Sequence, residues 1–348
     1  MLPFFSMRVG LLTGGGDAPG LNGILEAATR VLFQGGHEII GIEDGFAGVL
    51  QRRHRVITPG MVENLHTQAG TLLGTTNKMG TEGREAEFLT AWKELKLDGM
   101  IVAGGDGTFA GLKPFRENIP IIGVPKTIDN DLSGTELTFG YDTACSVVAD
   151  SVDALRATAE AHSRLIVVET MGRTAGWIAL GGGIASFAEV VLIPERPFSR
   201  PELVEFLRQK KAAGKRGLVL VVSEGARAQG EDVKVAFTVK DSPQAERYGG
   251  IAMELSRWLE AELRWEARPV VLGHLQRARP PTGTDRFLTL AMGVEAGRMA
   301  MEGAWGQACV YRGGAVARAP LDELMGAARL VPDGHRWVNL LKAMGSFI

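Results

Sequence analysis

Short apolar runs alternate with longer stretches of helical spacing along the first half of the chain. The runs are rich in Val, Ile and Leu, which is typical of buried strands, and the longer stretches place apolar residues three and four positions apart. The predicted strands are residues 7–12, 38–42, 99–103 and 119–124, and the predicted helices are residues 21–34 and 85–95. This alternation predicts a parallel sheet covered by helices on both faces.

The same alternation begins again near residue 142, which we take as a domain boundary. The second region holds predicted strands at 165–168, 190–193, 218–222 and 270–272, and predicted helices at 142–161, from 177, at 200–213 and at 250–263. Residues 226–244 are polar and predict a surface excursion. We therefore expect an α/β protein of two three-layer domains, with mainly parallel sheets flanked by helices and the active site in the cleft between them. The expected parts are residues 7–141 plus about 275–312, residues 142–274, and a C-terminal segment 313–348.

Composition narrows the function class. The chain has 348 residues, and its 38 Lys and Arg nearly balance 40 Asp and Glu, so no general attraction to nucleic acid or an anionic membrane is expected. No apolar stretch reaches the ~18 residues of a membrane span, and the first seven residues lack the basic start of a secretion signal. Cys145 and Cys309 show no metal-binding spacing, which favours a reducing, cytoplasmic location.

Polar turns follow three of the predicted strands in the first region. They are Gly14-Gly-Gly-Asp17, Gly104-Gly-Asp-Gly107 and Pro125-Lys-Thr-Ile-Asp-Asn-Asp131. The carboxyl ends of parallel strands share one edge of a sheet, and glycine lets the main chain approach a phosphate closely. Glycine also occurs in purely structural turns, so the first turn alone leaves both roles open. Neither a dinucleotide fingerprint nor a P-loop is present.

The carboxylates in these turns suggest phosphoryl transfer. Asp106, set among exposed amides, can hold Mg²⁺ on a polyphosphate, or it can cap the following helix. Asp129 and Asp131 can cap their own turn, but Asp129 beside Lys126 also offers a base for a hydroxyl and a cation for the moving phosphate.

Four arginines lie beside strand ends or glycine turns. Guanidinium groups match phosphate oxygens, so these residues are candidates for holding a phosphorylated acceptor, although a surface salt bridge is the commoner role for any one of them. They are Arg164, Arg173, Arg268 and Arg277.

Six motifs in order resemble those of the 6-phosphofructokinases, from Met7 to about Tyr311. They are Leu12-Thr-Gly-Gly-Gly-Asp-Ala-Pro-Gly-Leu-Asn22, Gly104-Gly-Asp-Gly-Thr108, Pro125-Lys-Thr-Ile-Asp-Asn-Asp131, Glu169-Thr-Met-Gly-Arg173, Ser223-Glu-Gly225 and Leu272-Gly-His-Leu-Gln-Arg277. The resemblance is to the bacterial type, with features of its mixed ATP and pyrophosphate subgroup. It implies an enzyme of glycolysis in the cytoplasm, usually a homotetramer.

The resemblance also implies that residues 7–141 plus about 275–312 hold the phosphoryl donor and that residues 142–274 hold the sugar phosphate. It further implies roles for individual residues. Asp129 matches the proton-accepting base, with Thr127 and Asp131 assisting and Arg173 as a further catalytic residue. The residues implied to bind fructose 6-phosphate are Thr127, Asp129, Met171, Gly172, Arg173, Glu224, His274 and Arg277, with Arg164 and Arg268 reaching it from a neighbouring subunit. The residues implied to bind the donor are Gly15, Asn77, Lys78, Asp106, Gly107, Thr108 and Gly111, with Asp106 linked to Mg²⁺.

Two positions bear on the donor. Gly107 resembles the ATP-using members, because the pyrophosphate users carry an aspartate there that would repel the nucleotide α-phosphate. Lys126 resembles pyrophosphate users and a mixed subgroup of ATP users. Since Gly107 decides whether ATP fits, we expect ATP to be the donor.

Other positions depart from the family. Asn77 stands where an arginine usually touches the transferred phosphoryl group, which predicts slow turnover that Asn77→Arg would raise. Glu26 and Ala213 replace basic residues of the bacterial effector site, which predicts weak control by ADP or phosphoenolpyruvate. Ala278-Arg-Pro-Pro281 replaces the usual Gly-Gly-Ser-Pro.

The sequence therefore predicts transfer of the ATP γ-phosphoryl group to the 1-hydroxyl of fructose 6-phosphate. One alternative is the same transfer from pyrophosphate. Another, of a different class, is a regulatory protein that binds sugar phosphate but has lost efficient catalysis, an idea that Asn77 motivates. A lipid or NAD kinase shares only the Gly-Gly-Asp-Gly-Thr loop.

Overall fold

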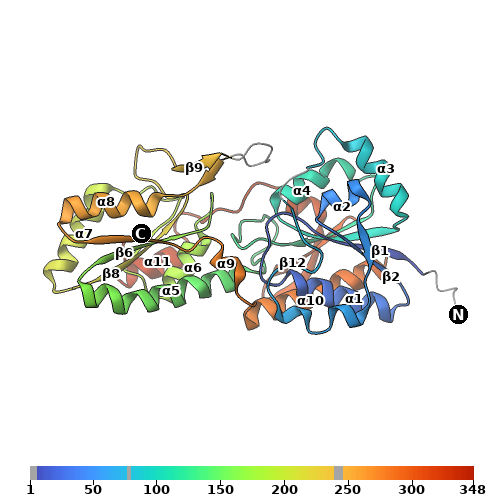
Figure 1. Ribbon diagram of the computed structural model, residues 1–348, viewed down its shortest axis with the longest axis horizontal. Coiled ribbons are helices and arrows are strands. Elements are labelled where there is room, and N and C mark those ends of the chain that lie inside the picture. Colours follow the sequence, from blue (N-terminus) through green and yellow to red (C-terminus); the bar gives the residue numbers. More distant parts are fainter. Residues whose placement is uncertain (1–5, 77–79, 239–245) are drawn as a thin grey trace. The chain divides into compact units, whose positions relative to one another are not determined.

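A computed structural model describes residues 6–76, 80–238 and 246–348. Contacts divide the chain into two compact units (Figure 1). The described residues of the first unit are 6–76, 80–143 and 277–328, and those of the second are 144–238, 246–276 and 329–348. The two units are described separately.

A mixed sheet forms the centre of the first unit. Among the described residues its seven strands run in the order β13-β12-β5-β4-β1-β2-β3. The five central strands are parallel, and the edge strands β3 and β13 are antiparallel to their neighbours. The bounds are β1 Arg8–Thr13, β2 Glu38–Ile42, β3 His54–Val56, β4 Gly99–Gly104, β5 Ile121–Pro125, β12 Gln307–Arg312 and β13 Ala315–Pro320.

Helices cover both faces of this sheet because side chains of both faces are apolar. Leu11 of β1 is buried with residues of α1 (Leu21–Gln34) and α10 (Gly283–Met301). Leu12, the next residue, points to the opposite face and is buried with residues of the three helices on that side. Those helices are α2 Phe46–Gln51, α3 Glu85–Leu95 and α4 Asp106–Leu112. Short 3-10 helices at Pro59–Val62, Leu65–Thr67, Lys113–Phe115 and Leu321–Met325 complete the unit.

The second unit is built on a smaller parallel sheet. In the described part of the chain it has four strands in the order β11-β6-β8-β7. Figure 1 shows α7 and α8 along one side of this sheet and α5 along the other. The strands are β6 Leu165–Thr170, β7 Val190–Leu192, β8 Leu218–Ser223 and β11 Ala267–Val271. The helices are α5 Tyr141–His162, α6 Trp177–Ala185, α7 Arg200–Ala212, α8 Ile251–Leu263, α9 Leu275–Ala278 and α11 Arg336–Ala343, and a hairpin pairs β9 Val235–Thr238 with β10 Glu246–Tyr248.

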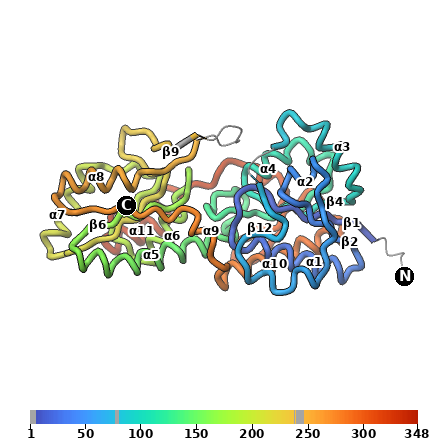
Figure 2. The backbone as a smooth tube through the Cα atoms, viewed as in Figure 1, coloured from blue at the N-terminus to red at the C-terminus, as the bar shows by residue number. Residues whose placement is uncertain are grey.

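Neither unit is a continuous stretch of chain. The chain passes between them after Thr143, after Gln276 and after Ala328. Figure 2 shows the red C-terminal segment among the green and yellow segments of the second unit. There Phe347 pairs with Val190 of β7, so the chain end completes that sheet.

One buried carboxylate links distant segments of the first unit. Asp285 of α10 accepts hydrogen bonds from the amides of Gly140 (2.9 Å) and Thr143 (2.8 Å). Burial raises the pKa of Asp285 to about 6. The start of α5 is therefore fixed to the start of α10.

The predicted fold class, α/β with mainly parallel sheets between helix layers, is confirmed. Residues 313–348 divide between the units, with 313–328 in the first and 329–348 in the second. The predicted surface excursion at 226–244 includes strand β9, which pairs with β10. Within the described residues, no helix combines the length and hydropathy that a membrane crossing requires.

Candidate functional site

The three polar turns lie at the carboxyl ends of neighbouring strands in the first unit. The amide of Gly14 donates to the carbonyl of Ala103 (2.9 Å), and the amide of Lys126 donates to the carbonyl of Gly104 (2.8 Å). A Cβ atom on Gly14 would lie 2.7 Å from Oγ1 of Thr108, so this approach of two turns requires glycine. The sheet therefore brings together the predicted donor turns.

The turn after β4 presents a carboxylate and an open surface. Asp106 begins α4, and its Oδ1 accepts a hydrogen bond from the amide of Gly107 at 2.7 Å. A Cβ atom on Gly107 would meet no atom within 4 Å. Thr108 is buried beneath, and the carbonyl of Gly111 accepts a hydrogen bond from Thr81 (2.7 Å). Asp106 and Gly107 are thus the exposed part of this turn.

The turn after β5 is held in shape by its own side chains. Asn130 has a left-handed backbone (φ 53°), and its Oδ1 accepts from the amide of Thr138 at 2.9 Å. The amide of Asp129 donates to Oγ1 of Thr127 at 3.1 Å. Asn130 was not among the predicted site residues, although its place between two aspartates is a signal for such a turn.

Asp129 is a carboxylate prepared to accept a proton. Its Oδ1 is buried without a hydrogen-bond partner among the described residues. Burial raises the pKa of Asp129, while the positive charges of Arg277 and Lys126 oppose that rise. Asp131 shares this environment, and burial together with the charge of Asp129 raises its pKa to about 7. A carboxylate that is buried yet close to cations suits general base catalysis near neutral pH.

Two cations join these turns. Burial and the charge of Arg277 lower the pKa of Lys126 to about 8. The Nζ atom of Lys126 donates to the carbonyl of Gly16, and the guanidinium of Arg277 donates to the carbonyl of Asp17. Because Asp106, Asp129 and Asp17 all interact electrostatically with Lys126, the first unit gathers three carboxylates around a buried lysine.

The second unit gathers a separate group at the carboxyl ends of β6 and β8. Gly172 follows β6 with φ 120°, and its carbonyl accepts a hydrogen bond from Ser223 at 2.6 Å. The guanidinium of Arg173 lies over the ring of Tyr248, 5.0 Å from its centroid. Three further predicted residues lie in this unit: Met171 directly after β6, Glu224 directly after β8, and His274, exposed, after β11.

Arg164 and Arg268 lie at the other edge of the same sheet. Arg164 directly precedes β6, and Arg268 is the second residue of β11, whose first residue pairs with Leu165. Both arginines bind the carboxylate of Glu266, Arg164 at 2.7 Å. Six strand residues separate Arg164 from Met171, a span of about 20 Å. The structure therefore does not bring these two arginines beside Arg173 within one chain.

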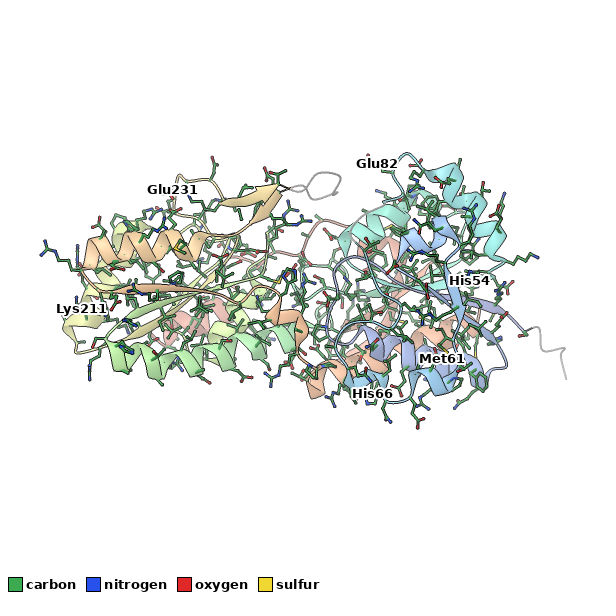
Figure 3. All side chains as sticks on the ribbon, in the orientation of Figure 1. His54, Met61, His66, Glu82, Lys211 and Glu231 are labelled. Atoms are coloured by element: carbon green, nitrogen blue, oxygen red, sulfur yellow. The ribbon has the colours of Figure 1, made fainter. Side chains whose placement is uncertain are left out.

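Of the predicted departures at Asn77 and Glu26, only Glu26 can be located. Asn77 and Lys78 lie outside the described residues. Glu26 is buried, and its Oε2 accepts hydrogen bonds from the amide (2.9 Å) and Nδ1 (2.8 Å) of His66, which Figure 3 labels beside the first unit's helices. Although burial opposes it, hydrogen bonds from His66 and Arg30 lower the pKa of Glu26. Glu26 thus connects α1 to the segment that holds His66.

A family model described as phosphofructokinase matches residues 8–300. The chain belongs to the phosphofructokinase family. The family predicted from the six motifs is thereby confirmed.

Phosphofructokinases from several bacteria resemble the whole chain. An "ATP-dependent 6-phosphofructokinase 3" of Streptomyces coelicolor is 39% identical over 337 residues, covering 94% of this chain and 98% of that protein. An "ATP-dependent 6-phosphofructokinase" of Chloroflexus aggregans is 41% identical over 351 residues, covering 97% and 96%. A crystal structure of a pyrophosphate-dependent phosphofructokinase from Marinobacter aquaeolei shares the fold, with a TM-score of 0.82, 20% identity and coverage of 96% and 91%.

Proposed function

We propose that this phosphofructokinase transfers the γ-phosphoryl group of ATP to the 1-hydroxyl of fructose 6-phosphate, which yields fructose 1,6-bisphosphate and ADP in glycolysis. The observation that carries the proposal is the buried carboxylate of Asp129 beside Lys126 and Arg277, at the edge where the donor turns meet. Relatives at 39% and 41% identity that span nearly the whole chain are named as ATP-dependent enzymes, which supports the choice of donor.

In this proposal Asp129 accepts the hydroxyl proton as the oxygen attacks the γ-phosphorus. Thr127 orients the loop through its hydrogen bond with the amide of Asp129 (3.1 Å), and Asp131 shares the negative charge of the site. Lys126, Arg277 and Arg173 offset the charge of the transferred group. The rate would fall if Lys126 lost its proton or if Asp129 kept its own. The pH range of activity therefore depends on the pKa values of both residues.

The donor is proposed to lie on the turns after β1 and β4. Gly15, Thr108 and Gly111 shape these turns, together with Asn77 and Lys78, which lie outside the described residues. The open space around Gly107 accommodates a nucleotide, whereas a carboxylate at that position would repel its phosphates.

Mg²⁺ is the proposed metal. Among the described residues no three His, Cys, Asp or Glu side chains gather to form a metal cage. Asp106 is exposed next to the donor turns, and Mg²⁺ is commonly held by one or two carboxylates with substrate phosphates and water. The residues therefore fit a metal brought with the nucleotide, which would neutralise phosphate charge.

Fructose 6-phosphate is proposed to be held by Met171, Gly172, Glu224, His274 and Arg173 of the second unit, with Thr127, Asp129 and Arg277 of the first. Arg164, with Arg268 beside it on the neighbouring strand, lies about 20 Å along β6 from Met171 within one chain. We therefore propose that they bind the sugar phosphate of a neighbouring subunit in a homotetramer.

The proposed location is the cytoplasm. Cys145 and Cys309 are both buried free thiols, which suits a reducing compartment.

The decisive experiment compares ATP with pyrophosphate at equal Mg²⁺, in the parent enzyme and in Asp129→Ser. We expect turnover with ATP, and a loss of about 10²- to 10⁴-fold in kcat on removing the base. Asp150→Ser, an exposed carboxylate on α5, is the matched control and should keep parent activity. Preference for pyrophosphate would overturn the donor, and binding of fructose 6-phosphate without turnover would overturn the enzymatic role.

A further inference from the structure

The guanidinium group of Arg173 packs on an aromatic ring, and within the described part of the chain its Nε atom lacks the hydrogen bond that a buried Nε usually makes. Its Cζ lies 5.0 Å from the centroid of the Tyr248 ring. Its Nε atom is buried and has no hydrogen-bond partner among the described residues. A guanidinium over an aromatic face is attracted to it and keeps its N–H edges available for other partners.

The backbone is held on both sides of Tyr248. Tyr248 ends β10 and pairs with Val235 of β9. Just after it, the carboxylate of Glu169 accepts hydrogen bonds from the amides of Gly250 (3.1 Å) and Ala252 (2.9 Å). Glu169 is only 4% exposed, so these bonds are shielded from water.

Glycine is required where the hairpin meets this carboxylate. Gly249 has φ 143°, and a Cβ atom there would lie 3.1 Å from Oε1 of Glu169. Glu169 belongs to β6, the strand that also leads into Arg173. Glu169, near the end of β6, thus anchors the chain that follows Tyr248, and Arg173 lies four residues after Glu169.

We propose that Tyr248 is a positioning residue for Arg173, and that Glu169 sets the place of Tyr248. The inference rests on the proposed function, in which Arg173 acts on the sugar phosphate and the transferred group. A free arginine side chain must lose rotamer entropy when it binds phosphate. A guanidinium already seated on the ring has lost part of that freedom before the substrate arrives.

The test removes the aromatic face and restores it conservatively. We expect Tyr248→Leu and Tyr248→Met to lower kcat/KM for fructose 6-phosphate about 3- to 30-fold, the range of a cation–π contact. Tyr248→Phe, which keeps the ring, should stay within about twofold of the parent. Glu169→Gln is a milder perturbation and should also lower kcat/KM for fructose 6-phosphate.

Trp258 provides a matched control in the same unit. Its ring lies under Arg200 at 4.6 Å, and Arg200 is held by Glu231 and Glu254 through ion pairs. Trp258→Leu removes a similar contact and should leave kcat/KM at the parent value. Thermal unfolding of each variant shows whether the fold is retained.

A double variant separates positioning from general damage. In an Arg173→Ala background, Tyr248→Leu should cause no further loss, because there is no guanidinium left to position. An equal loss in both backgrounds would overturn the proposal. So would an Arg173→Ala enzyme as active as the parent, a Tyr248→Leu enzyme as active as the parent, or a Tyr248→Phe enzyme as poor as Tyr248→Leu.

Calorimetric binding of fructose 6-phosphate keeps the test independent of turnover. A parent protein without phosphoryl transfer would contradict the proposed function alone. The role of Tyr248 would then be decided by whether Tyr248→Leu weakens binding by the same factor as expected for kcat/KM, while Tyr248→Phe does not.

Discussion

The charge of Lys126 can be removed or made permanent by single substitutions. Its side chain is buried, 3% exposed, and its pKa is lowered to about 8 by burial and by Arg277. Its positive charge in turn lowers the pKa of Asp129. Lys126→Met removes that charge, whereas Lys126→Arg keeps a cation that stays protonated above pH 12.

The expected shift follows from Coulomb's law. At an effective dielectric constant of about 20, two unit charges about 5–8 Å apart interact by about 2–3 kcal/mol, which is the scale on which one neighbouring charge acts on a carboxyl group. Because burial already raises the pKa of Asp129 and Lys126 opposes that rise, the pKa of Asp129 should rise further in Lys126→Met, while Arg277 still limits the rise. A raised pKa means that the base is still protonated at a pH where the parent is active.

The assay is the pH dependence of kcat/KM for fructose 6-phosphate at saturating ATP and Mg²⁺. The parent should gain activity as Asp129 loses its proton, and lose activity near pH 8 as Lys126 loses its own. In Lys126→Met, the rise of kcat/KM on the acid side of the profile, its acid limb, should move to higher pH. In Lys126→Arg, only the fall of kcat/KM near pH 8 should disappear. Lys113→Met, at an exposed position, is the control. An unmoved acid limb in Lys126→Met, or a fall near pH 8 that persists in Lys126→Arg, would refute this reasoning.

Three further predictions test other parts of the molecule. Co-expression of Arg173→Ala with Arg268→Ala chains should raise activity well above the residual activity of either variant alone, because mixed oligomers regain intact sites; absence of recovery would contradict a site shared between subunits. Gly107→Asp should fold normally but lower kcat/KM for ATP about 30- to 100-fold through phosphate repulsion, with pyrophosphate affected less; equal losses with both donors would contradict the specificity role. Because His66 helps lower the pKa of Glu26 below 4.5, the stabilisation by Glu26 is present above that pH and is lost as the pH falls through the lowered pKa. Glu26→Gln should therefore reduce the free energy of unfolding by about 1–3 kcal/mol at pH 7 and by less near pH 3, and denaturant titrations at both values check this.

The periodicity of the sequence was enough to predict most of the fold. The predicted helix at 21–34 and the predicted strand at 38–42 have the bounds of α1 and β2, because clear apolar spacing is bounded there by glycines. Strands β12 and β13 were not predicted. Their partners are distant or antiparallel, and alanine and arginine in Ala315–Pro320 weaken the apolar signal.

The sequence placed most candidate residues at strand ends, but it could not predict which of them lie close to one another in the fold. That Asp106 and Asp129 act on the same buried lysine, Lys126, depends on long-range pairing between β4 and β5. Tyr248 was missed because it lies beyond a polar segment and contacts Arg173 only through the fold. Glu26 was recognised as a departure from the family, but its bonds to His66 needed the structure.

The order in which the ribosome releases the chain has a consequence for assembly. Residues 21–34 bury their apolar face against residues 283–301. The strand at 121–125 pairs with the strand at 307–312, which is synthesised much later. An emerging polypeptide therefore exposes a half-covered sheet through most of translation, when chaperones can bind it. Nascent chains stalled before residue 280 should be protease-sensitive in their amino-terminal part. They should gain resistance only once α10, β12 and β13 have left the exit tunnel.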